Sequence, residues 1–253
     1  MASVSADPKK RFSGRVENYS LYRPGYPAEA MQYIFDRTKI NSQSSVADIG
    51  AGTGIFTELL LSSGSGVIAV EPNESMRLAA DNILQGNNNY SSIAGSAEAT
   101  GLASHSIDLI TAAQAFHWFK LAEAKTEFNR ILKPQGKIVL IWNRRDEGRS
   151  AFMRQYASLL QSRLPEYNKV NHANATDERI GDFLGANMQK AEFPSYQRFD
   201  LVGLKGRLLS SSYCPAVGAD SHEEIMAELE ILYEQHASET GVQFDYITQV
   251  YLA

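Results

Sequence analysis

The segment VADIGAGTGIF, residues 46–56, constrains the fold of this 253-residue chain more than any other feature. An apolar run leads directly into three alternate glycines, Gly50, Gly52 and Gly54, and a helical pattern follows. Glycines accept backbone angles that other residues avoid, and they let the backbone approach a ligand closely. The free N–H groups at a helix start add a site for polar ligand groups. The segment therefore predicts a strand, a ligand-binding turn and a helix in succession.

Apolar runs and helical patterns alternate on both sides of this turn. We predict strands at residues 45–49, 67–70, 90–94, 107–113 and 138–142, helices at 28–39 and 121–132, and a turn at Lys133-Pro134-Gln135-Gly136. Nearly continuous apolar strands separated by helices are typical of a parallel sheet covered on both faces. The fold class is therefore α/β, with a Rossmann-like parallel sheet and helices on both faces.

The last third of the chain has a different pattern. After a helix at 152–164, it holds two predicted strands, 189–201 and 242–252, joined by a helix that opens at the capping-box sequence Ser221-His222-Glu223-Glu224. Such a pair suits an antiparallel edge on the parallel sheet, with the insertion at about 203–220 as a lid. We expect one domain over 1–253, made of an N-terminal helical cap (1–39), a cofactor-binding core (40–145) and a C-terminal half (146–253).

Composition excludes several classes of function. The net charge of −5 is the wrong sign for a nucleic-acid-binding surface. No apolar run reaches the roughly 18 residues of a membrane-spanning helix, and the N-terminus lacks the apolar core of a signal peptide. One cysteine, Cys214, allows no internal disulfide, and the five histidines show no metal-binding spacing. We expect a cytoplasmic protein, monomer or homodimer, without metal, nucleic-acid or membrane partners.

Two acidic residues limit which ligand the glycine turn is expected to bind. Glu71 ends the second predicted strand, where a carboxylate can accept the hydroxyls of a ribose. The glycine spacing is G-x-G-x-G, whereas dinucleotide sites carry G-x-G-x-x-G. Asp48, directly before the turn, would repel a pyrophosphate but can face an ammonium group. These features favour a nucleoside with an amino-acid tail over NAD.

The motifs together resemble those of a known enzyme family. VADIGAGTG, VIAVEPN at 67–73, GSAEATGLASHSIDLITAAQAFHWF at 95–119 and ILKPQGKIVLIWN at 131–143 are similar, in order and spacing, to the class I S-adenosylmethionine-dependent methyltransferases. The segments NYSLYRPGYP and AFHWF resemble the small-molecule subgroup that includes ubiquinone/menaquinone and trans-aconitate methyltransferases. The resemblance implies methyl transfer from S-adenosylmethionine to a small molecule.

The resemblance also implies cofactor contacts. The three glycines would lie beneath the methionine and ribose, and Glu71 would hold the ribose hydroxyls. Many relatives carry an acid at position 96 for the adenine amine; Ser96 departs from this, so Glu98 or a backbone group would replace it. The remaining implied cofactor contacts are Asp48, Pro72, Met76, Ala97, Gln114 and Phe116.

The acceptor side is less constrained. If the acceptor is a hydroxyl or an acidic carbon, a base is needed, and His117 is the best-placed candidate; a structural histidine is the equal alternative. If it is a carboxylate, arginines should hold it, and Arg23, Arg144 and Arg145 are candidates unless they are simply exposed loop charges. Aromatic rings tolerate a sulfonium charge, and the remaining predicted substrate contacts are Tyr19, Tyr22 and Trp118.

Two other functions remain open from the sequence. One is an NAD-dependent oxidoreductase on a similar sheet, which the glycine spacing and Asp48 disfavour. The other is a non-catalytic cofactor-binding protein of the same fold, since the family has no invariant catalytic residue whose loss would reveal it.

Overall fold

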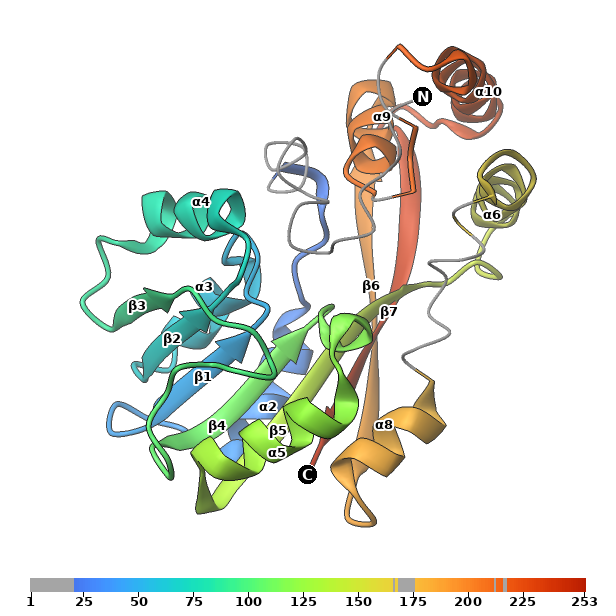
Figure 1. Ribbon diagram of the computed structural model, residues 1–253. Coiled ribbons are helices and arrows are strands. Elements are labelled where there is room, and N and C mark those ends of the chain that lie inside the picture. The colour runs from blue at the N-terminus through green and yellow to red at the C-terminus, as the bar shows by residue number, and fades with distance from the viewer. Residues whose placement is uncertain (1–20, 166, 168–175, 212, 216–217) are drawn as a thin grey trace.

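The computed structural model describes residues 21–165, 167, 176–211, 213–215 and 218–253. Within these residues, seven strands form one sheet in the order β3-β2-β1-β4-β5-β7-β6 (Figure 1). The strands are β1 Ser45–Ile49, β2 Gly66–Val70, β3 Tyr90–Ile93, β4 Ile107–Ala113, β5 Leu132–Arg145, β6 Gln189–Phe199 and β7 Val242–Leu252.

The sheet is parallel except at β7. The neighbours from β3 to β5 pair in parallel, whereas β7 runs antiparallel to both β5 and β6. This confirms the predicted Rossmann-like sheet with an antiparallel edge region. The antiparallel strand itself is second from the edge, and β6 is the outermost strand.

Helices cover both faces of the sheet, as predicted. They are α2 Ala28–Thr38, α3 Ile55–Leu61, α4 Glu74–Leu84, α5 Leu121–Ile131, α6 Ala151–Arg163, α8 Asp177–Leu184, α9 Leu201–Leu209 and α10 Asp220–His236, with the 3₁₀ turn η1 at Phe116–Trp118. On one face α5 and α8 pack through Phe128 and Phe183. On the other, α2 and α3 pack through Ile34 and Leu60. Both sets of side chains are almost fully buried, so the sheet is the centre of the core.

Strand order determines where a ligand can bind. The chain builds outward from β1 through β2 to β3, and then returns to add β4 on the other side of β1. In open α/β sheets this reversal leaves a crevice at the carboxyl ends of the two central strands. The glycine turn follows β1 and η1 follows β4, so both predicted cofactor segments lie at this edge.

The C-terminal elements extend the molecule beyond the same edge. Helices α6, α9 and α10 gather around the outer ends of β6 and β7 and share a second core that includes Leu160, Leu204, Leu229 and Phe244 (Figure 1). Because β5 and β6 both run antiparallel to β7, they run in the same direction. Helix α9, which follows β6, therefore starts on the side of the sheet where the ligand edge lies.

The turn predicted at residues 133–136 is wrong: these residues belong to β5. Leu132 pairs with Ile107 and Lys137 with Leu109, so four residues of β5 stand opposite Asp108 alone. The segment is a large bulge in the ladder, and Lys133 Nζ binds the Asp108 carboxylate at 2.7 Å. A sequence pattern cannot show this, because the bulge depends on the partner strand.

The predicted capping box is also wrong. Helix α10 begins at Asp220, and the residue before it, Ala219, has no side chain that could accept a hydrogen bond. Residues 203–209 of the insertion predicted at 203–220 belong to α9. The N-cap of this helix is Asp200, whose side chain accepts the Gly203 N–H at 2.7 Å.

Candidate cofactor and substrate site

The glycine turn has a backbone that favours glycine at all three positions. Gly50, Gly52 and Gly54 have φ angles of 71°, 59° and 85°. A Cβ on Gly50 would lie 2.6 Å from the Cβ of Ala115, so the turn is packed closely against the segment that follows β4. The carbonyl of Val70, at the end of β2, accepts the Gly50 N–H at 2.8 Å. The turn is thereby fixed between the ends of β2 and β4.

Glu71 connects the glycine turn to the next helix. One carboxylate oxygen accepts the N–H of Gly52 at 2.9 Å, and the other accepts the N–H of Asn73 at 2.8 Å. Burial raises the pKa of Glu71, and the two backbone N–H groups oppose this. A carboxylate oxygen can accept more than one hydrogen bond, so each oxygen keeps acceptor capacity for a ligand hydroxyl.

Asp48 does not face the ligand edge. It is completely buried, and its two oxygens accept the hydroxyls of Thr57 at 2.7 Å and Thr111 at 2.8 Å. Burial raises the pKa of Asp48 to about 6, although the two hydroxyls oppose the shift. The predicted direct cofactor contact is therefore corrected: Asp48 lies beneath the turn and ties β1 to α3 and β4.

The predicted adenine side has two parts. Met76 is buried in the first turn of α4, with its Sδ 3.7 Å from the place of a Cβ on Gly52, and half-buried Pro72 precedes that helix. Ala97, 4% exposed, lies after β3 in a loop closed by a pair of hydrogen bonds between Ser96 and Ala99.

Glu98 is bound to protein groups. Its Oε1 accepts the N–H of Lys120 at 2.9 Å, just before α5. Burial raises its pKa, but this N–H and the Ser96 hydroxyl outweigh burial, so the pKa lies below its usual value. Glu98 thus holds the loop in place, and its proposed contact with adenine would have to share that carboxylate.

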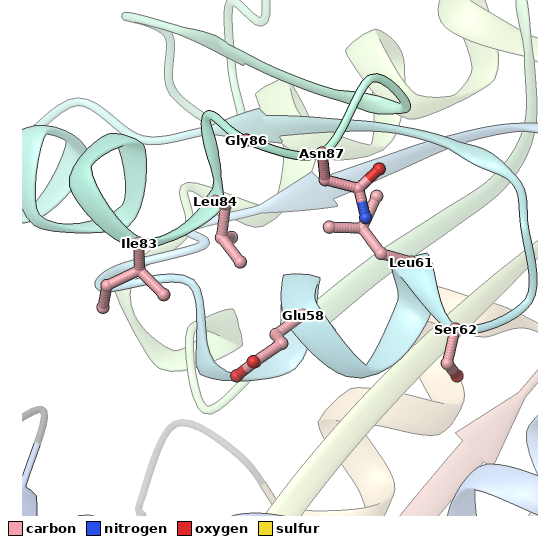
Figure 2. Close-up of a pocket in the computed structure, with 7 residues that line it drawn as sticks. All are labelled: Glu58, Leu61, Ser62, Ile83, Leu84, Gly86 and Asn87. Atoms are coloured by element: carbon pink, nitrogen blue, oxygen red, sulfur yellow. The ribbon is translucent and has the colours of Figure 1, made fainter.

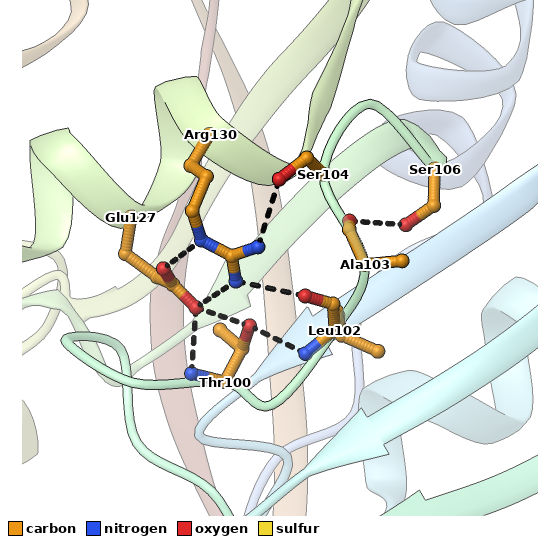
Figure 3. A network of polar contacts seen from close by, with 7 residues as sticks. All are labelled: Thr100, Leu102, Ala103, Ser104, Ser106, Glu127 and Arg130. Carbon is orange, nitrogen blue, oxygen red and sulfur yellow. Dashed lines mark hydrogen bonds and ion pairs between the residues drawn. The ribbon is translucent and has the colours of Figure 1, made fainter.

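A polar network fixes the rest of this loop (Figure 3). The Glu127 carboxylate accepts both the N–H and the hydroxyl of Thr100, at 2.8 and 2.6 Å, and binds Arg130 at 2.7 Å. Arg130 in turn donates to the carbonyl of Leu102 at 2.8 Å. Chiefly because of Arg130, the pKa of Glu127 falls to about 2. The loop that carries Ser96–Glu98 is therefore anchored to α5 by an ionised network.

Two predicted cofactor contacts, Gln114 and Phe116, follow the end of β4, and their side chains have different surroundings. Gln114 has an unusual positive φ of 56°, and its side-chain Nε2 donates to the carbonyl of Asn143 at 3.1 Å. Phe116 has no exposed surface and packs against Phe119 and Phe183, so its predicted role as a cofactor-facing ring is wrong. The apolar core formed by α5 and α8 takes up this ring.

His117 and Trp118 remain at the surface of the site. Both are half-buried, with ring centres 4.4 Å apart, and His117 also meets the ring of Trp142 edge-on at 5.3 Å. The histidine therefore sits in an aromatic surround at the carboxyl end of β4, near the glycine turn that Ala115 touches.

The side chains of the two arginines at the end of β5 point to opposite faces of the strand. Successive strand residues point to opposite faces, and Arg144 is exposed on the side of Asp177 and Tyr251, whose pKa values it influences. The side chain of Arg145 is 9% exposed and is bound to two tyrosines. The two side chains thus lie on opposite faces of β5, and the substrate contacts expected for Arg144 and Arg145 both stay predictions.

The N-terminal segment reaches α9. Arg23 donates to the carbonyl of Ser210 at 2.9 Å, and the ring of Tyr22 packs so closely on α9 that a Cβ on Gly206 would overlap it. Asn143, beside Gln114, donates to the carbonyl of Gly25 at 2.9 Å. Residues 22–25 thus lie between the end of β5 and α9. The predicted contact Tyr19 lies outside the described residues.

Known proteins match the chain both in sequence and in fold. Residues 47–140 match the methyltransferase domain family. A methyltransferase of Schizosaccharomyces pombe is 28% identical over 96% of both chains. A methyltransferase-like protein from the same yeast is 40% identical over 54% of this chain, a match that spans about half (53%) of that relative. A type II methyltransferase structure from Anaeromyxobacter dehalogenans covers 92% of this chain and 97% of its own, with a TM-score of 0.67 and 23% identity.

Residues 47–140 thus carry a methyltransferase domain, and the chain is similar in sequence and fold to the class I S-adenosylmethionine-dependent methyltransferases. The strand order, the glycine turn after β1 and the acid after β2 agree with that assignment. The cofactor of the family is the one predicted from the sequence.

Sequence reasoning missed two buried polar residues near this candidate site. Asn143 joins Gln114, Gly25 and, through its Oδ1, the Thr248 hydroxyl at 2.6 Å. Arg207 is 5% exposed in α9. The mostly apolar run LVGLKGRLL contains two cations, Lys205 and Arg207, and was a weak signal that one of them is buried; nothing in the sequence marked Asn143.

A hollow elsewhere on the methyltransferase is not the cofactor site. It lies between the last turns of α3 and α4 and is lined by residues such as Glu58, Ile83 and Asn87 (Figure 2). None of the predicted cofactor contacts lines it. In the part of the chain that the structure describes, no helix is long and apolar enough to cross a membrane, and no group of three or more His, Cys, Asp or Glu side chains is arranged to hold a metal ion.

Proposed function

We propose that this methyltransferase binds S-adenosylmethionine between the glycine turn and the loop at 96–98, and methylates a small molecule. The observation that carries the proposal is the position of Glu71, which holds the Gly52 and Asn73 N–H groups and retains acceptor capacity for two ribose hydroxyls. The close packing of Gly50 on Ala115 brings the same turn to the start of η1. These residues fit the cofactor of the family.

Each group has a task in this arrangement. Met76 and Pro72 flank the adenine, with Ala97 at its edge, and Gln114 lies where the methionine part passes. The bound cofactor supplies an electrophilic methyl group on a sulfonium. The protein must then align the acceptor with that methyl group and exclude water.

The acceptor would approach from the side of η1, α9 and the N-terminal segment. Trp118 provides an aromatic face near the sulfonium, which cation–π attraction favours. His117 is the candidate base if the acceptor must lose a proton as the methyl group arrives. The contact between Tyr22 and α9 supports closure of the site by the predicted cap and insertion.

A methyl-transfer assay tests this proposal. Purified protein is incubated with S-adenosylmethionine and separate sets of small carboxylates, phenols and amines, and S-adenosylhomocysteine formation is measured. Acceptor-dependent product with at least one set is expected. Product formation with none of the sets, although S-adenosylhomocysteine binds, would favour the non-catalytic alternative. An unchanged kcat for the active acceptor in His117→Gln would remove the base role.

A further inference from the structure

Two buried guanidinium groups lie beyond the ligand edge. Arg145 extends from the end of β5 and donates to the hydroxyls of Tyr213 and Tyr167, at 2.8 and 2.6 Å. Arg207 extends from α9 and donates to the Tyr246 hydroxyl at 3.0 Å and the Ser211 hydroxyl at 3.2 Å. Almost all partners of the two cations are therefore neutral hydroxyl groups.

The positive charge of this cluster is only partly balanced. Among the described residues, one carboxylate meets it: Glu147, whose Oε1 is 3.5 Å from Arg145 Nε and 37% of whose side chain is exposed. Burial raises the pKa of Tyr213, but the two guanidinium groups outweigh burial and lower it below its usual value. A buried charge is costly unless an opposite charge accompanies it. The cluster is thus prepared for an anion.

Tyr156 provides a further donor. It is fully buried on α6, and its hydroxyl has no hydrogen-bond partner among the described residues. Its ring centre is 6.0 Å from the Arg145 guanidinium, and both arginines act on its hydroxyl electrostatically. A buried hydroxyl without a hydrogen-bond partner destabilises the fold by about 1–3 kcal/mol. We therefore expect a ligand to supply the acceptor for the Tyr156 hydroxyl.

The cluster lies close to the proposed reaction centre. Arg145 is two residues beyond Asn143, whose carbonyl accepts the side chain of Gln114. Two residues along a strand cover about 7 Å. A small acceptor could therefore reach from these cations to the methyl group.

We propose that Arg145, Arg207 and Tyr156 bind a carboxylate of the methyl acceptor. This rests on the proposed function, because it specifies the acceptor for that same site. Guanidinium groups match the two oxygens of a carboxylate, and the Tyr156 hydroxyl would donate a third hydrogen bond. Two cations with one carboxylate leave a net charge near +1 in the described residues, which suits a monocarboxylate better than a phosphate dianion.

The test measures ligand binding in two independent steps. Calorimetry first measures S-adenosylhomocysteine binding, which tests the proposed function alone. With that ligand saturating, thermal shifts are then recorded with acetate, hexanoate and benzoate, with benzamide as the neutral analogue of benzoate, and with inorganic phosphate. All samples have matched ionic strength. Stabilisation by at least one carboxylate, and less by benzamide and phosphate, is the expected result.

Tyr156→Phe separates a binding role from a structural one. Since the hydroxyl has no partner, its removal should leave the unliganded protein as stable or more stable, while the affinity for the active carboxylate falls roughly 5- to 30-fold. Tyr196→Phe, at a tyrosine 60% exposed on β6, is the matched control and should change neither the stability nor the carboxylate affinity. Any one of four results would overturn the proposal, even if S-adenosylhomocysteine binds. They are an unchanged carboxylate affinity in Tyr156→Phe, equal thermal shifts by benzoate and benzamide, preferential stabilisation by phosphate, and no shift by any carboxylate.

Discussion

At the scale of single residues, the two acids near the glycine turn have different tasks. Glu71 is hydrogen-bonded to the turn itself and keeps acceptor capacity toward the ligand edge. Asp48 is fully enclosed and joins three elements through the hydroxyls of Thr57 and Thr111. The first residue is therefore expected to control cofactor affinity, and the second the pH dependence of folding.

We expect Glu71→Gln to weaken S-adenosylhomocysteine binding roughly 10- to 100-fold, because hydrogen bonds to a charged acceptor contribute about 1.5–3 kcal/mol. Calorimetry would measure this. Glu74→Gln, an exposed acid in the first turn of α4, is the control and should bind normally. Equal affinity of the Glu71 variant and the native protein would contradict the assigned ribose contact.

Asp48→Asn should change how stability depends on pH. Because the folded-state pKa of about 6 exceeds the ordinary aspartate value of 3.8, protonated Asp48 stabilises the fold below pH 4, and that contribution is lost as pH rises to about 6. The loss is on the order of 3 kcal/mol. Urea unfolding at pH 4 and pH 8 should therefore show the variant gaining stability relative to the native protein at the higher pH. A parallel pH dependence of the two proteins would refute this.

At the scale of elements, contacts between distant segments form the region proposed to hold the acceptor. The N-terminal segment lies against α9 through Tyr22 and Arg23, and the end of β5 lies beside both through Asn143. The shape of this region therefore depends on contacts between residues far apart in the sequence; Arg23 and Ser210 are separated by 187 positions.

Gly206→Ala should disturb this contact. The new Cβ would overlap the Tyr22 ring, and an overpacked contact costs about 1–3 kcal/mol. Gly181→Ala in α8 is the matched control, since its nearest neighbour would be the Met188 Cε at 3.9 Å, an ordinary distance. That helix should gain up to about 1 kcal/mol. Urea unfolding compares the two, and similar stability changes would show that Tyr22 does not rest on α9.

Elements were predictable where a local pattern decides them. Strands β1 and β4 have the predicted bounds because each is a mostly buried and mostly apolar run, and a glycine directly follows β1. The bulge in β5 was not predictable, since it is defined by Asp108 on the neighbouring strand. Site residues followed the same rule. The glycines and Glu71 belong to a local motif, whereas burial of Arg207 depends on Tyr246, 39 positions away.

At the scale of the whole molecule, the chain combines a family core with a second core. The part of the sheet from β3 to β5 carries the proposed cofactor contacts, and the second core formed with α6, α9 and α10 holds Arg207. The opposite faces of Arg144 and Arg145 illustrate why sequence position alone could not show which of them belongs to the proposed carboxylate site. Only the tertiary arrangement shows which arginine is directed toward this second core.

Binding of S-adenosylhomocysteine to the native protein tests the central claim most directly. A ligand at about 100 times its dissociation constant stabilises a protein by about 2.7 kcal/mol. For a chain of this size, that corresponds to a rise in Tm of roughly 5–10 °C. We predict this rise with S-adenosylhomocysteine and none with NAD. No rise at saturating S-adenosylhomocysteine, or an equal rise with NAD, would contradict the account.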